Sequence, residues 1–174
     1  VAQRNRFLNY AEAFESRALR DGLTHEEIAA VYQQIDRLME GGPNAFLSAA
    51  ERTKLAEQLM YNSAYPRTID QGANNTCNVT TIEARVFSKH PEDAAKMVTD
   101  VALTGKYTMP DGSVVDVGRV KGADFIPDDN ENGGVLAYAF DRNSNSKFPP
   151  DVKIDKKRNW VDEIFQNTAV NINY

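Results

Sequence analysis

Two residues of the sequence, Gln71 and Cys77, have the types and spacing needed for chemistry at a carbonyl group. Cys77 is the only cysteine, and we expect it to open a helix that begins near residue 76 or 77 and ends near Ser88. A thiol at a helix N-terminus lies at the positive end of the helix dipole, which lowers its pKa and favours the reactive thiolate. The Gln71 amide and the backbone N–H of Cys77 are the expected donors to the oxyanion that forms on the attacked carbonyl.

The segment that holds these residues resembles the start of the catalytic domain of papain-like cysteine peptidases, calpains included. The resemblance rests on Gln71 and Gly72, four further residues, and then Cys77 at the start of an apolar helix. A later segment, 160–169, is similar to the helix that calpain-type domains carry between the catalytic Cys and His. The resemblance implies that Cys77 is the nucleophile, Gln71 the oxyanion-hole donor, and a peptide or protein the substrate. Asn78 departs from the family, which usually has an aromatic residue after the Cys.

The general base is the part of this site that the sequence does not supply. In the family the catalytic His lies far downstream of the Cys, whereas the only histidines here are His25 and His90. His90 follows Cys77 by 13 residues, roughly 20 Å along a continuous helix, which is too far for proton transfer. His25 lies in the first turn of a capped helix before the Cys. We therefore expect the base to come from a continuation of the chain beyond Tyr174 or from another chain.

A non-catalytic interpretation remains open beside the peptidase interpretation. Cys77 is then a small buried residue in a helix, and Gln71 is a loop amide that bonds to the backbone. The chain would be an α+β binding or scaffolding domain with a structural cysteine.

A weak candidate for a calcium site lies further along the chain. Asp128, Asn130 and Asn132 precede Gly133 in the pattern D-x-N-x-N-G, the first half of a calcium-binding loop. Position twelve of that loop is Ala139, where a bidentate Glu is required. Asp and Asn also fill ordinary turns, and this interpretation is favoured. We expect no other cofactor.

The sequence pattern of the N-terminal third of the chain predicts helices with short connections. Apolar residues at helical spacing predict a helix over residues 1–20. Capping boxes at Thr24–Glu27 and Ser48–Glu51 predict the starts of two further helices, the first of which stops at residues 41–43. Residues 1–62 therefore form a helical N-terminal unit.

The sequence pattern of residues 63–174 predicts a mixed α+β segment. Pro91 opens a second helix after that of Cys77, and Gly105 ends it. Two short strands flank the turn 110–113, a short apolar run covers 135–140, and helical spacing returns from Trp160 to about residue 170. The fold class is thus α+β with helix predominant. Residues 63–174 are expected to be the first lobe of a papain-like domain, with helices and a small β-hairpin.

Composition excludes several classes of function. The 174 residues carry a net charge of -5 without a run of Lys or Arg, which argues against a nucleic-acid surface. The sequence has no run of about 18 apolar residues, the length that would predict a membrane span. We therefore expect a soluble protein of undetermined compartment. One cysteine excludes an intrachain disulfide.

Overall fold

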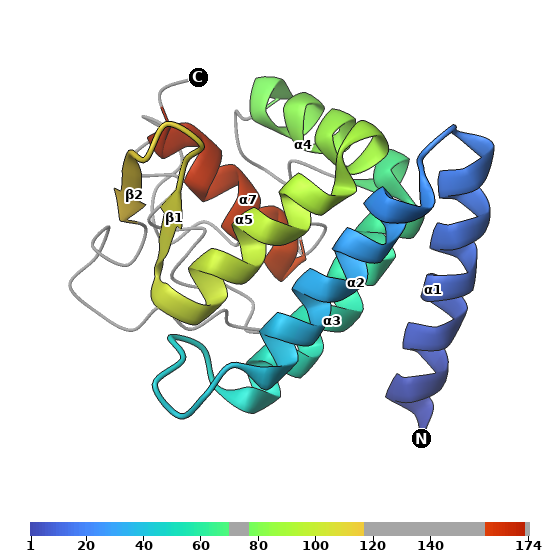
Figure 1. Ribbon diagram of the computed structural model, residues 1–174, viewed down its shortest axis with the longest axis horizontal. Helices are drawn as coiled ribbons and strands as arrows, with labels where there is room; N and C mark the ends of the chain where they lie inside the picture. Colours follow the sequence, from blue (N-terminus) through green and yellow to red (C-terminus); the bar gives the residue numbers. More distant parts are fainter. Residues whose placement is uncertain (70–76, 117–158, 173–174) are drawn as a thin grey trace, which may run out of the picture.

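The computed structural model describes residues 1–69, 77–116 and 159–172, which are mainly helical (Figure 1). A two-stranded antiparallel sheet and a short 3-10 helix, η1, accompany the α-helices. The helix-predominant α+β class is confirmed at this level, and the papain-like lobe stays a prediction. The elements are α1 (Ala2–Arg20), α2 (His25–Glu40), α3 (Ala49–Ala64), η1 (Pro66–Thr68), α4 (Cys77–Lys89), α5 (Pro91–Thr104), β1 (Lys106–Thr108), β2 (Val114–Asp116) and α7 (Trp160–Asn171).

Helices α2 and α3 begin at the two predicted capping boxes. The Thr24 hydroxyl accepts from the Glu27 N–H at 3.1 Å, and the Glu27 carboxylate accepts from the Thr24 N–H at 2.7 Å. Ser48 and Glu51 form the same pair of hydrogen bonds, at 3.4 Å and 2.7 Å. Each box satisfies backbone N–H groups that the helix itself leaves without a partner.

The C-termini of α2 and α5 are closed in different ways. Gly105 follows α5 with a φ of 72°, the left-handed conformation expected of a C-terminal glycine. Gly41 follows α2 with a φ of -42°, so it does not form such a cap. Instead, the buried Arg52 of α3 donates to the carbonyls of Leu38 at 2.9 Å and Leu47 at 2.7 Å, and also to that of Gly41. A buried guanidinium therefore satisfies the end of α2.

One hydrophobic core joins helices that are far apart in the sequence. Helix α1 packs along α3, α2 packs along α5, and α4 lies against both α5 and α7 (Figure 1). Small residues on α5 allow this close approach, because Ala94, Ala95 and Ala102 are fully buried. None of the described helices combines the length and apolar character needed to cross a membrane. Among the largest buried side chains are Phe14, Leu38, Leu55, Leu59, Met60, Phe87, Ile164 and Phe165.

The predicted hairpin is present, with strand bounds that differ slightly from the expected ones. Tyr107 of β1 pairs with Val115 of β2. In the turn between them, Gly112 has a φ of 86°, and the Asp111 carboxylate accepts from the Ser113 N–H at 2.9 Å. The apolar run 135–140 lies outside the described residues.

The capping box of α3 supplies a test of this local structure. Replacing Ser48 by Ala leaves the Glu51 N–H without its acceptor, so we expect the free energy of unfolding to fall by about 1 kcal/mol. Urea denaturation followed by circular dichroism measures the change. Ser16→Ala, at an exposed position of α1, is the control and should stay within about 0.5 kcal/mol of the parent. Equal losses in the two variants would contradict the capping role.

Candidate functional site

Helix α4 begins at Cys77, as the sequence predicted, and ends at Lys89. Gln71 lies outside the described residues, so its role as an oxyanion-hole donor stays a prediction. The described part of α4 is a 13-residue helix whose first residue is the single cysteine. The first N–H groups of a helix have no partner within it, and the role expected of Cys77 depends on these groups.

Buried polar and aromatic contacts fix α4 against α7. The buried Glu83 of α4 accepts a hydrogen bond from the Gln166 amide of α7 at 2.9 Å. One turn further along α4, the Phe87 ring lies with its centroid 6.1 Å from that of Phe165. A buried polar group is costly to leave without a hydrogen-bond partner, so this pair sets the register between the two helices.

A second polar network fixes the start of α7 on α3. The Asn62 amide of α3 donates to Asp162 at 2.7 Å, and the Asn159 amide donates to the Asn62 oxygen at 2.7 Å. Asn159 and Asp162 also bond to each other's backbone N–H groups, at 2.9 Å and 3.0 Å, as in a capping box. The helix predicted from Trp160 is thus confirmed, and α3, α7 and α4 form one connected scaffold.

Neither histidine lies near Cys77. His90 directly follows the last residue of α4, about 20 Å from its first residue at the usual rise per residue. His25 is the first residue of α2, two positions before Glu27, whose carboxylate lies beside the His90 ring. Both imidazoles therefore belong to the opposite end of α4, which confirms the expected separation and excludes both as the general base for Cys77 within one chain.

A histidine and two carboxylates meet at this opposite end, where α2 and α5 begin. Glu27, His90 and Glu92 place one potential ligand atom each within 4.8 Å of one another. The Glu27 carboxylate already accepts from the N–H and hydroxyl of Thr24, which lowers its pKa. Two helix N-termini also direct the positive ends of their dipoles at the cluster, which disfavours a bound cation. Of the three residues, Glu27 caps α2, whereas His90, the N-cap residue of α5, makes no side-chain capping hydrogen bond.

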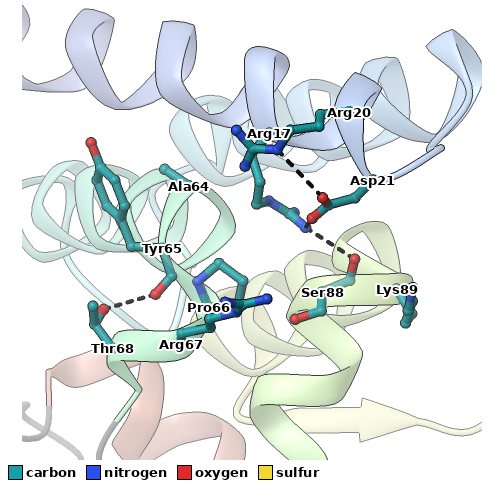
Figure 2. Close-up of a pocket in the computed structure, with 10 residues that line it drawn as sticks. All are labelled: Arg17, Arg20, Asp21, Ala64, Tyr65, Pro66, Arg67, Thr68, Ser88 and Lys89. Carbon is teal, nitrogen blue, oxygen red and sulfur yellow. Dashed lines mark hydrogen bonds and ion pairs between the residues drawn. The ribbon is translucent and has the colours of Figure 1, made fainter.

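An open groove of about 680 Å³ lies between the end of α1, η1 and the end of α4 (Figure 2). Its walls carry four cationic side chains and one carboxylate, although no segment of the sequence is rich in Lys or Arg. The fold assembles this basic surface from three separate segments. The charged lining residues are Arg17, Arg20, Asp21, Arg67 and Lys89.

Arg17 forms the floor of this groove and ties α1 to the end of α4. Its guanidinium donates to the carbonyls of Ser88 at 3.0 Å and Phe87 at 3.1 Å, and to the Asp21 carboxylate at 3.2 Å. Its side chain is only 7% exposed, and burial lowers its pKa. Arg17 thus supplies donors to carbonyls that α4 leaves unpaired at its C-terminus.

Sequence reasoning did not identify Arg17, although a signal was present. Arg17 lies three residues after Phe14 and one before Ala18, within the apolar stripe of α1 that faces the core. A charged residue in such a stripe requires a buried partner. The partners lie 70 and 71 residues away, so the sequence did not indicate them.

The candidate calcium ligands Asp128, Asn130 and Asn132 lie outside the described residues. The calcium site therefore stays a weak prediction, and the turn interpretation stays open beside it.

No protein-family model, curated protein or solved structure matches the chain. The resemblance to papain-like peptidases thus rests on the residues around Cys77 and on the helix from Trp160.

The buried Arg17 and its exposed neighbour Arg20 provide a matched pair of variants. Arg17→Met removes the donor from the buried Phe87 carbonyl and from the partly buried Ser88 carbonyl, so we expect the free energy of unfolding to fall by about 3 kcal/mol. Arg20→Met, whose side chain is 72% exposed in the parent, should change it by less than about 0.5 kcal/mol. Urea denaturation of both variants measures the difference. A loss below about 1 kcal/mol for Arg17→Met would contradict its anchoring role.

Glu92 supplies a pH-dependent test of the cluster at the start of α5. Burial raises the pKa of Glu92, and among the described residues its Oε2 atom has no hydrogen-bond partner. A carboxyl whose pKa is higher in the folded than in the unfolded protein stabilises the fold while it is protonated. This stabilisation is lost as the pH rises through the pKa of the folded state. Glu92→Gln should therefore raise the free energy of unfolding near pH 7, and this gain should disappear near pH 3.5, where the Glu92 carboxyl is largely protonated.

Asp93→Asn is the control for Glu92→Gln, because Asp93 is an exposed acid in the same first turn. Its neutralisation removes a favourable interaction with the helix dipole and should lower stability slightly at pH 7. Urea denaturation at both pH values measures the two effects. Destabilisation by Glu92→Gln at pH 7 would contradict the assigned cost of burying its charge.

Proposed function

We propose that the chain carries the nucleophile of a papain-like cysteine peptidase, with Cys77 as that nucleophile. The observation that carries the proposal is the start of α4 at Cys77. In the proposed reaction the Cys77 thiolate adds to a peptide carbonyl, and the oxyanion accepts from Gln71 and the Cys77 N–H. The amine then leaves with a proton, and water hydrolyses the thioester to the acid and the free thiol.

The surroundings of α4 support this role, because a nucleophile requires a rigid support. The Glu83–Gln166 bond holds the middle of the helix, and Arg17 holds its end. In this proposal residues 63–174 form the first lobe, and residues 1–62 are a helical unit that packs on it through α2 and α3. The described residues of both parts share one hydrophobic core.

The general base has to come from a group other than His25 or His90, because both lie at the opposite end of α4. A thiolate without its base loses most of its activation. We therefore expect an acidic thiol in this chain, with peptide hydrolysis only after a base has been added. The same separation favours the second candidate function, a non-catalytic binding or scaffolding domain.

The rate of iodoacetamide alkylation tests the first proposal. We expect native Cys77 to react with an apparent pKa below the value of about 8.5 for a free thiol, because the thiolate lies at the helix N-terminus. Intact mass measured over a pH series from about 5 to 9 gives the rates. The same series in urea, where α4 is unfolded, is the matched reference and should titrate near the free-thiol value.

Alkylation that occurs only after unfolding would overturn the peptidase proposal, because it would identify Cys77 as a core residue. The chain would then be assigned to the non-catalytic alternative. Cys77→Ser controls for modification at other residues and should gain no mass in either series.

A further inference from the structure

The groove at the end of α4 has a charge opposite to that of the protein. Arg17, Arg20, Arg67 and Lys89 carry four positive charges and Asp21 one negative charge, which leaves a net charge of +3, whereas the whole chain carries -5. We propose that this groove binds an acidic peptide segment of a partner protein. The expected ligand groups are the carboxylates of successive Asp or Glu residues.

Three of the four cations are available to such a ligand. Arg67 and Lys89 are exposed and form no ion pair with any described residue. Arg20 reaches Asp21 only at 3.7 Å, and its side chain is 72% exposed. Arg17 is already engaged by carbonyls and by Asp21. Its role is therefore to hold the groove in shape, and the ligand contacts belong to the other three.

The three available cations come from different elements, as Figure 2 shows: Arg20 from α1, Arg67 from η1 and Lys89 from the end of α4. Cations separated in this way suit a ligand with several charges spaced along a chain better than a single compact anion. Arginine side chains also match the planar geometry of carboxylates.

The remaining wall is apolar enough to contact the aliphatic parts of a peptide. Tyr65 is 41% exposed at the edge of the groove, and its ring packs against Tyr10 and Tyr61, which fix its position. Pro66 lies beside it but is buried, so Tyr65 supplies the apolar contact of this wall. Acidic side chains have short apolar stems, so a wall of this kind adds contact area beside the charge pairs.

A long nucleic acid fits this surface less well. Beyond the groove, a polyanion would meet a chain whose net charge is negative, and nucleic-acid sites need extended positive potential. A short acidic segment requires only the local potential of the groove. The groove also lies about 20 Å from Cys77, at the other end of α4, so this proposal does not depend on the peptidase proposal.

Fluorescence anisotropy with a fluorescein-labelled peptide of about eight glutamates tests the proposal, because such a peptide is long enough to span the groove when extended. We expect saturable binding at low ionic strength that weakens as salt is added. Arg67→Glu combined with Lys89→Glu should raise the dissociation constant at least about tenfold, because it replaces two attractions with two repulsions. Arg20→Glu alone should raise it about threefold.

Arg4→Glu is the matched control for Arg20→Glu, because it makes the same charge change at an exposed position at the other end of α1. It should leave the dissociation constant unchanged within about twofold. Urea denaturation of every variant verifies the fold. The proposal is overturned if the peptide does not bind, or if Arg4→Glu weakens binding as much as Arg20→Glu does. Displacement by inorganic phosphate as effective as that by unlabelled peptide would also overturn it, in favour of a small phosphorylated ligand.

Discussion

The structure depends on buried polar side chains that hydrogen-bond to helix ends and to one another. Arg17 satisfies the carbonyls at the end of α4, and Arg52 does the same at the end of α2. Glu83 bonds to Gln166 between α4 and α7. Such groups are costly to bury without partners, so arrangements of the helices that break these hydrogen bonds are disfavoured. They restrict the packing of helices whose apolar faces alone would tolerate several registers.

Helix α4 has two chemically different ends because its peptide dipoles align. Its N-terminus carries partial positive charge, which favours anionic groups and is the basis of the role proposed for Cys77. Its C-terminus carries partial negative charge, which favours the cations Arg17 and Lys89 close to it. Both histidines of the chain are also at the C-terminal end. The same helix thus separates a proposed nucleophile from a proposed anion-binding groove.

Local patterns in the sequence predicted most of the described elements. The capping boxes at Thr24 and Ser48 determine helix starts through contacts three residues apart, and Pro91 acts within a single turn. The start of α4 was predicted near residue 76 or 77, and the described helix begins at Cys77. The basic groove was not, because its cations come from segments that only the tertiary fold brings together. Charged residues within apolar stripes, such as Arg17, indicated buried polar partners, but the distant residues that satisfy them could not be identified from one sequence.

The proposed peptidase role requires α4 to present Cys77 as an activated thiol. The chain has a single cysteine, so labelling cysteine with ¹³C at Cβ gives one resonance whose shift follows the thiol directly. A pH titration of that resonance in the folded protein measures its pKa without any reagent. We predict a midpoint clearly below the value of about 8.5 for a free thiol, because the helix N-terminus favours the thiolate. A midpoint at or above that value would contradict the claim and would identify Cys77 as a structural residue.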